Sequence, residues 1–220
     1  MADLPVVVCF GDSNTHGFDG ATFERFPLDV RWPGVVAGEL AGRARVVEEG
    51  LGGRTTIWDD PFTTGRNGRA YLLPCLRSHA PVAAVVIMLG TNDLKAYYRL
   101  GPADIAQGAG SLVEMARQSL VGPAGTPPAV LLVAPPPIGA LTITSELWGY
   151  GTSHEASLRL APLYREAAAQ AGASFLDAGE LVATDPADGV HLEAAAHATL
   201  GRAIARIVES LLTGVSGSAG

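Results

Sequence analysis

The sequence predicts a three-layer α/β fold around a five-stranded parallel sheet. Short runs rich in Val, Ile and Leu alternate along the chain with longer helix-like segments. The apolar runs do not alternate strictly between polar and apolar residues, which is typical of strands buried on both faces of a parallel sheet. A repeated strand–helix rhythm of this kind favours helices on both faces of one sheet.

The expected elements follow each other without an internal linker or repeat. The expected strands are 6–10, 46–47 with its flanks, 82–89, 130–134 and 174–176. The expected helices are 31–42, 68–79, 102–120, 153–171 and 192–212. We therefore expect one domain over residues 1–212 and a frayed tail rich in Gly, Ser and Ala over 213–220. Two stretches, 54–70 and 135–152, are long for simple connections and are expected to be functional.

The composition excludes several classes of protein. The 220 residues are 48% hydrophobic and carry a formal net charge of −7. The apolar content argues against a disordered chain, and the absence of a basic cluster argues against a nucleic-acid or anionic-membrane partner. The longest apolar run, 82–89, is far shorter than the ~20 residues that span a membrane. The sequence therefore predicts a globular protein without a membrane anchor.

The cysteines and the N-terminal region point to a reducing compartment. Cys9 and Cys75 are the two cysteines, too few for a disulfide scaffold or a Cys-rich zinc site. No positively charged segment precedes the first apolar run, so we expect no secretory signal. The expected location is the cytoplasm.

Polar and glycine-rich turns follow the predicted strands. The sequence GDSN (11–14) follows the first strand, GLGGR (50–54) the second and GTND (90–93) the third. The sequence DGVH (188–191) comes between the fifth strand and the last expected helix. Because ligands of open parallel sheets bind outside the carboxyl ends of the strands, we expect these segments to meet on one rim.

These segments contain the groups that acyl transfer needs. The Ser13 hydroxyl needs a base to become a nucleophile, and His191 can take its proton. Asp188, three residues before His191, can orient the imidazole through its other nitrogen. The backbone N–H groups of Ser13 and Gly53 and the side-chain amide of Asn92 can stabilise an oxyanion. The sequence thus predicts a Ser13–His191–Asp188 triad with an adjacent oxyanion hole.

Simpler explanations exist for several of these residues. Ser13 or Asp12 could cap the first helix, and Asn92 could cap a later one. Asp185 competes with Asp188 as the partner of the base, although Asp185-Pro186 is typical of a turn. The presence of all the motifs together, and the spacing to the histidine, favour the catalytic interpretation.

The four other histidines have ordinary explanations. His16 is expected to border the pocket, and His79 to interact with a helix dipole. His154 and His197 are expected on helix surfaces. None of these histidines has a metal-binding spacing, and no GxSxG elbow, Walker loop or GxGxxG motif occurs. We therefore expect neither a metal nor a cofactor.

The motifs GDSN, the glycine turn at 50–53, GTND and DGVH occur in the order typical of SGNH hydrolases, also called the GDSL family. Longer strings, such as DVRW (29–32), RTT (54–56) and IMLGTNDLKAY (87–97), are similar to the bacterial arylesterase/acyltransferase branch of that family. The resemblance covers residues 6–212. Asn14, Gly52 and Phe18 depart from residues common at these positions in the family.

The resemblance implies a flavodoxin-like SGNH fold with Ser13, His191 and Asp188 as catalytic residues. It also implies an oxyanion hole at Ser13, Gly53 and Asn92. Asp12, Phe18 and Trp148 are expected to bind substrate. The branch forms closed oligomers, so a homo-oligomer, by resemblance an octamer, is expected.

The expected activity is hydrolysis or transesterification of short-chain aryl or alkyl esters, with small esters and alcohols as substrates. A carbohydrate acetyl esterase using the same triad is the alternative. A non-enzymatic flavodoxin-like binding module is disfavoured because the sequence has no phosphate-cradling loop.

Overall fold

The computed structural model describes residues 4–216 and has a five-stranded sheet at its centre. All strand pairs are parallel, and the order is β2-β1-β3-β4-β5. The strands are β1 (Val6–Gly11), β2 (Arg45–Gly50), β3 (Val82–Met88), β4 (Ala129–Ala134) and β5 (Ser174–Asp177). This order is that of flavodoxin-like doubly wound sheets. The predicted fold class is confirmed.

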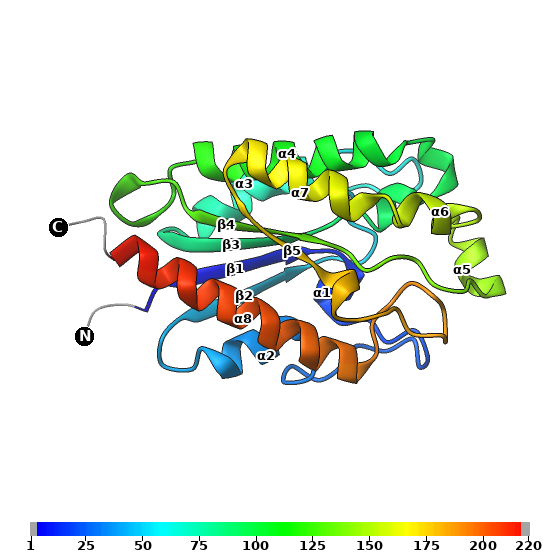
Figure 1. Cartoon of the computed structure of the whole chain (residues 1–220), viewed down its shortest axis with the longest axis horizontal. Coiled ribbons are helices and arrows are strands. Elements are labelled where there is room, and N and C mark those ends of the chain that lie inside the picture. Colours follow the sequence, from blue (N-terminus) through cyan, green and yellow to red (C-terminus); the bar gives the residue numbers. More distant parts are fainter. Residues whose placement is uncertain (1–3, 217–220) are drawn as a thin grey trace.

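Helices cover both faces of the sheet (Figure 1). The longer helices on one face are α3 (Gly68–Ser78), α4 (Pro102–Gln118) and α7 (Leu160–Ala171), and those on the other are α2 (Trp32–Glu39) and α8 (Ala194–Ser216). Successive strand side chains point to opposite faces. Val8 therefore packs under α3, α4 and α7, whereas Val7 packs toward α2 and α8. Two separate cores result, one on each face.

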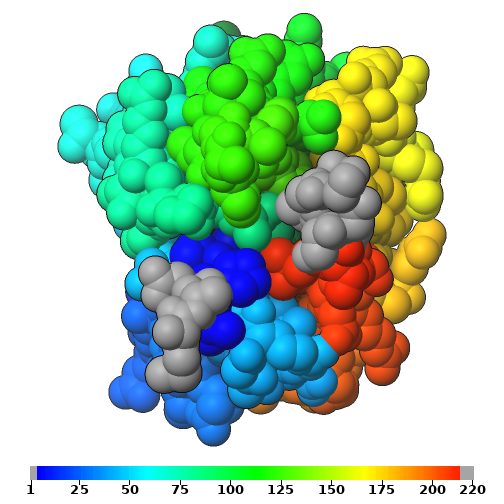
Figure 2. All heavy atoms as spheres, turned by 90° about the vertical axis from the view of Figure 1, so that its left-hand side faces the viewer, coloured from blue at the N-terminus to red at the C-terminus, as the bar shows by residue number. Residues whose placement is uncertain are grey.

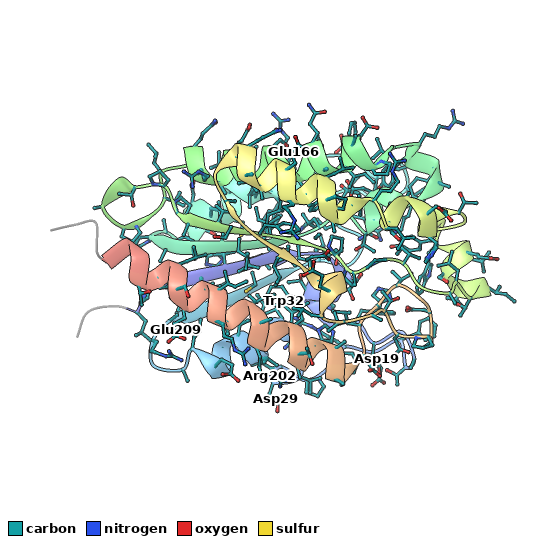
Figure 3. The ribbon with its side chains drawn as sticks, viewed as in Figure 1. Asp19, Asp29, Trp32, Glu166, Arg202 and Glu209 are labelled. Carbon is teal, nitrogen blue, oxygen red and sulfur yellow. The ribbon has the colours of Figure 1, made fainter. Side chains whose placement is uncertain are left out.

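Trp32 anchors the core beneath the sheet. Its side chain is fully buried and lies near α8 (Figure 3). Glu166 and Arg202, in contrast, are exposed on the outward faces of α7 and α8. The helices therefore turn apolar stripes toward the sheet and charged residues toward water, as amphipathic helices do.

The structure departs from the expected elements in the segments near the carboxyl ends of the strands. The short helices α1 (Ser13–His16) and α5 (Ile143–Leu147) were not expected, and the helix expected over 153–171 is divided into α6 (Ser153–Ser157) and α7. Helix α8 continues to Ser216, so the tail expected from residue 213 begins within a helix. The last residues of the expected tail, 217–220, lie outside the described part of the chain. The remaining turns are the 3-10 helices Asn92–Leu94, Ala96–Tyr98, Pro123–Gly125 and Ala178–Glu180.

The two ends of the sheet differ. In Figure 1 the carboxyl ends of the strands point toward α1 and α5, where the long connecting segments gather. Figure 2 shows the opposite end, where the start of β1 and the last turns of α8 come together. Within residues 4–216, no helix has both the length and the apolar character needed to cross a membrane.

Candidate active site

A sharp turn after β1 presents Ser13. Asp12 is the N-cap of α1, and its carboxylate accepts a hydrogen bond of 2.9 Å from the backbone N–H of Asn14. Glycine is required at the end of the strand, because a Cβ on Gly11 would lie 1.9 Å from Oγ1 of Thr15. The strand thus passes directly into a helical turn that places the serine at the edge of a pocket.

Ser13, His191 and Asp188 form a continuous hydrogen-bonded chain. The Ser13 Oγ–His191 Nε2 distance is 2.9 Å, and His191 Nδ1 lies 2.6 Å from Asp188 Oδ2. The other oxygen of Asp188 accepts hydrogen bonds from the backbone N–H groups of Val190 (2.7 Å) and His191 (2.8 Å). One short loop therefore orients both the carboxylate and the imidazole.

The electrostatics of this chain define the histidine tautomer. Burial acts to raise the pKa of Asp188, but the hydrogen bonds and charge of His191 outweigh it and hold that pKa below its ordinary value. An ionised carboxylate accepts hydrogen bonds only, so His191 Nδ1 carries the proton. In the neutral imidazole, the lone pair of Nε2 is then directed at the Ser13 hydroxyl, the geometry that a general base requires.

Two further residues, neither of them predicted as a site residue, position this loop. The side-chain amide of Asn14 donates to the Val190 carbonyl (3.2 Å), and its oxygen accepts from the Leu192 backbone N–H (3.0 Å). Asn14 thereby joins the serine turn directly to the histidine loop. A Cβ on Gly20 would lie 2.0 Å from Oδ2 of Asp188, so only glycine fits there. The GDSN motif contains Asn14, but no local pattern distinguishes Gly20.

The predicted oxyanion donors border the same pocket. Gly53 has φ +78°, a left-handed conformation that favours glycine. The Asn92 side-chain amide donates to the Arg54 carbonyl (3.1 Å), and its oxygen accepts from the Tyr150 hydroxyl (3.1 Å). These bonds fix the amide orientation. Gly53 and Asn92 line the pocket together with Ser13 and His191.

Asp12 is not in the lining of this pocket, contrary to expectation. Its side chain is 1% exposed, and one oxygen lies 3.5 Å from the Asn92 amide nitrogen. Burial raises the pKa of Asp12 to about 6. The N-cap position directs the carboxylate back toward the helix amides, so Asp12 supports the turn and does not contact the pocket.

The pocket has a volume of about 590 Å³. Phe18 and Trp148, which were predicted to bind substrate, line it, with ring centroids 4.6 and 5.6 Å from that of His191. The lining residues are Ser13, Phe18, Gly52, Gly53, Phe62, Arg66, Asn92, Lys95, Tyr97, Leu147, Trp148, Gly149, Tyr150 and His191. Several of them come from the stretches 54–70 and 135–152, which were expected to be functional.

Arg54 holds the ends of β1 and β2 together behind the pocket. Its guanidinium donates to the carbonyls of Gly11 (2.8 Å) and Glu49 and stacks 4.2 Å from the centre of the Phe10 ring. Arg54 follows Gly53 directly in the chain, so this buried anchor also fixes the position of the predicted oxyanion donor.

Two histidine expectations were wrong. His16 is absent from the pocket lining. His197, expected on the surface, is 0% exposed, and its Nδ1 accepts a hydrogen bond of 3.3 Å from the Trp32 backbone N–H. Burial lowers the pKa of His197 to about 4, so the ring is neutral at neutral pH. In the sequence, His197 is flanked by alanines, which occur on both buried and exposed helix faces, so its burial could not be predicted.

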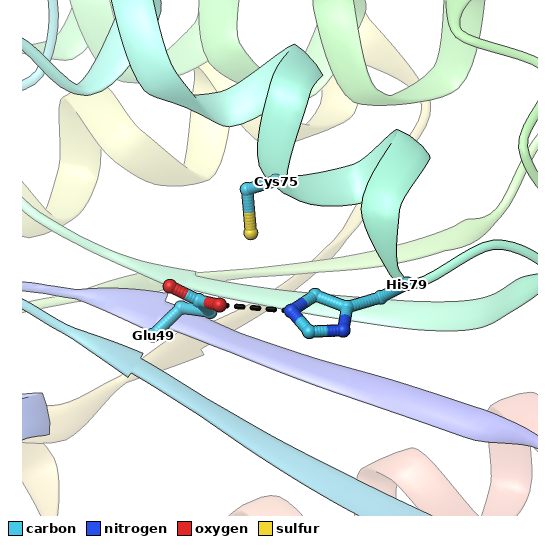
Figure 4. Close-up of side chains that lie close together, drawn as sticks. All are labelled: Glu49, Cys75 and His79. Atoms are coloured by element: carbon cyan, nitrogen blue, oxygen red, sulfur yellow. Dashed lines mark hydrogen bonds and ion pairs between the residues drawn. The ribbon is translucent and has the colours of Figure 1, made fainter.

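A second cluster of titratable groups lies between β2 and α3 (Figure 4). His79 Nε2 is 2.8 Å from Glu49 Oε1, and the ligand-type atoms of Glu49, Cys75 and His79 lie within 4.8 Å of one another. Burial, then the Glu49 charge, raises the pKa of the Cys75 thiol to about 12, which disfavours the thiolate that metals bind. We interpret the cluster as a hydrogen-bonded tie between strand and helix.

Comparisons with known proteins show the family to which the chain belongs. The model of the GDSL-like lipase/acylhydrolase family matches residues 9–199. The M. smegmatis aryl esterase is similar in structure, with 42% identity over 94% of this chain and 100% of that chain and a TM-score of 0.88. A putative arylesterase from Agrobacterium tumefaciens shares 43% identity over 95% and 100% of the two chains, with a TM-score of 0.86.

A third similar structure is that of Est24, a carbohydrate acetylesterase from Sinorhizobium meliloti, with 40% identity, coverage of 94% and 99%, and a TM-score of 0.89. A search of curated proteins gave no match. The fold and the family match define a carboxylic ester hydrolase of the SGNH type. The chain belongs to the GDSL-like lipase/acylhydrolase family.

Proposed function

We propose that the protein is a serine esterase that acts on short-chain aryl or alkyl esters through a covalent acyl-enzyme. His191 Nε2 takes the proton of Ser13 as Oγ attacks the ester carbonyl carbon. The resulting oxyanion is stabilised by the backbone N–H groups of Ser13 and Gly53 and by the Asn92 amide. Collapse of this intermediate breaks the ester C–O bond, and His191 returns the proton to the leaving alcohol. Water or a second alcohol then releases the acyl group by the same steps in reverse.

The observation that carries this proposal is the alignment of Ser13, His191 and Asp188 at 2.9 and 2.6 Å at the edge of a 590 Å³ pocket. The Asn92 amide adds a second support. One of its hydrogens bonds the Arg54 carbonyl at 3.1 Å, while the contact to Asp12 is 3.5 Å. A bond that long is weak, so the second hydrogen remains available for an oxyanion.

Turnover of phenyl acetate tests the proposal. We expect a burst of phenol from the wild type, covalent labelling of Ser13 by a phosphonate, and neither signal from Ser13→Ala. Unchanged turnover in Ser13→Ala would refute the mechanism. Ser111→Ala, which removes a hydroxyl on α4 outside the pocket, is the matched control.

We also propose acyl transfer to alcohols as a second activity of the same site. The aromatic wall of Phe18 and Trp148 lies directly against His191 and disfavours water relative to a small alcohol. The product ratio in mixtures of ethanol and water measures this. Transfer above the molar fraction of ethanol supports the proposal, and a ratio equal to that fraction contradicts it.

We propose that the protein also forms a homo-oligomer. Ile143 and Leu147 of α5 are 79% and 82% exposed beside the pocket, and Phe62 is 77% exposed. An apolar group of this kind at a pocket entrance fits a contact between subunits. Sedimentation that gives a ~23 kDa monomer at micromolar concentration would contradict it.

The free cysteines Cys9 and Cys75 favour a cytoplasmic location.

Deacetylation of carbohydrates is the second candidate. The Sinorhizobium relative is named a carbohydrate acetylesterase, and Tyr97 and Arg66 contribute polar groups to the pocket lining. Relative kcat/KM for acetylated sugars and phenyl acetate discriminates between the two. A clear preference for the sugar esters would support this candidate.

A further inference from the structure

The catalytic pocket has two chemically different walls. Phe18, Leu147 and Trp148 form an apolar wall beside His191. Arg66 and Lys95 contribute two cationic side chains, here called the cationic wall. None of the described residues that line the pocket carries a carboxylate. The charged side chains of this described lining are therefore both cationic, although Asp60, which lies outside the lining, pairs with Arg66.

Lys95 is the chain's one lysine and is only 8% exposed. Among the described residues, its ammonium group has neither a hydrogen-bond partner nor an ion-pair partner. Its nearest recorded contact is the Tyr150 ring, whose centroid lies 5.5 Å from Nζ. Burial, followed by the charge of Arg66, lowers the pKa of Lys95, and the charges of Asp60, Asp12 and Asp93, which form no direct ion pair with it, only partly offset this. A buried cation without a partner is costly unless a bound group compensates it.

Arg66 is held rigidly next to the reaction site. Its guanidinium lies 3.2 Å from Asp60 Oδ2, and that buried carboxylate also accepts hydrogen bonds from the hydroxyls of Tyr97 (3.3 Å) and Tyr98 (3.1 Å). A Cβ on Gly53 would lie 2.6 Å from the central carbon of the guanidinium. The cationic wall is thus preorganised and directly borders a proposed oxyanion donor.

We propose that this wall binds a carboxylate carried by the substrate, so that the preferred substrates are short esters with an acidic group. A carboxylate placed between Lys95 and Arg66 gives the unpaired ammonium a partner and relieves the repulsion between the two cations. The proximity of Arg66 to Gly53 requires a short spacer between this carboxylate and the ester carbonyl. The inference rests on the proposed esterase function and specifies its substrate class.

Matched pairs of anionic and neutral esters test the proposal. Mono(4-nitrophenyl) glutarate is compared with 4-nitrophenyl pentanoate, where the acid lies on the acyl side. 4-Acetoxybenzoate is compared with its methyl ester, where the acid lies on the alcohol side. We expect one anionic ester to have a kcat/KM roughly ten- to hundred-fold above its neutral partner, the factor of one charge-assisted hydrogen bond.

Variants separate recognition of the substrate from a general electrostatic effect. Lys95→Met and Arg66→Met should each reduce the anionic-to-neutral ratio to within a few fold of unity, mainly through KM. Arg69→Met, which removes an exposed charge outside the pocket, should leave the ratio unchanged. Melting curves establish that each variant folds, and Lys95→Arg should restore part of the ratio.

The possible outcomes are distinct. A selective loss with the anionic ester supports the proposal. An equal loss with both esters, or a wild type that favours neither anionic ester, overturns it. Hydrolysis of phenyl acetate tests the esterase function independently, because that substrate carries no charge.

Discussion

Two histidine–carboxylate pairs among residues 4–216 have similar geometry but different surroundings. His191 Nδ1 lies 2.6 Å from Asp188, and His79 Nε2 lies 2.8 Å from Glu49. The free nitrogen of His191 faces the Ser13 hydroxyl at the edge of a pocket. The thiol beside the Glu49–His79 pair belongs to the buried Cys75, whose pKa is raised to about 12.

The difference is the reason why we propose a catalytic role for the first pair and not for the second. A nucleophile within hydrogen-bond distance and space for a substrate distinguish the first pair from the second. None of Glu49, Cys75 and His79 lines the catalytic pocket. Substitution of His191 should therefore reduce mainly the activity, whereas substitution of His79 should reduce mainly the stability.

The largest expected effect is that of His191→Ala. Removing the base leaves the Ser13 hydroxyl without a proton acceptor, so kcat/KM for phenyl acetate should fall on the order of 10⁵-fold. Steady-state kinetics at pH 7.5 measure the loss, and circular dichroism verifies the fold. A fall smaller than ten-fold would remove His191 from the mechanism.

His197, the other buried histidine, has no carboxylate partner among the described residues, and its titration should make stability depend on pH. The pKa of His197 is lowered from 6.5 to about 4, mainly by burial, so the unfolded chain takes up its proton first as the pH falls. The stability that neutral His197 contributes is thus present above pH 6.5 and is lost toward pH 4. The loss amounts to on the order of 3 kcal/mol.

Urea unfolding between pH 4 and 7.5 measures this loss. His197→Gln cannot titrate, so its free energy of unfolding should vary less with pH than that of the wild type over this interval. If the free energy of unfolding depends on pH in the same way in both proteins, His197 is not the responsible group.

The smallest expected effect is that of His79→Ala. Loss of the hydrogen bond to Glu49 should lower the free energy of unfolding by roughly 1 kcal/mol, the usual contribution of one hydrogen bond. The kcat/KM for phenyl acetate should remain within about two-fold of the wild type, because the pair lies outside the pocket. A double-mutant cycle with Glu49→Gln isolates the pair. A large loss of activity without loss of stability would contradict the structural interpretation.

Elements that a local sequence pattern specifies were predicted, whereas elements without such a pattern were missed. The strands were predicted to within a few residues, because buried parallel strands are continuous apolar runs. The helices α1 and α5 were missed, since four- and five-residue helices show no full period of apolar residues. The division of 153–171 at Leu158 and Arg159 was missed because the amphipathic pattern continues across it.

The candidate site was predictable where its residues follow strand ends. Ser13, Gly53, Asn92 and His191 come from segments that parallel topology places on one rim, and all four line one pocket. Asp12, which was expected to bind substrate, does not line the pocket, because capping directs its carboxylate inward. Sequence position alone does not indicate in which direction a capping side chain faces the surrounding protein.

The sequence by itself determined the fold class and the chemical groups of the site, because both depend on local patterns and on the short spacing of Asp188 and His191. Tertiary structure alone decided that Gly20 makes room for Asp188, that His197 is buried and that Lys95 lines the pocket without an ion-pair partner among the described residues. Each of these features depends on contacts between segments far apart in the chain. Close packing, which no local pattern encodes, decides such contacts.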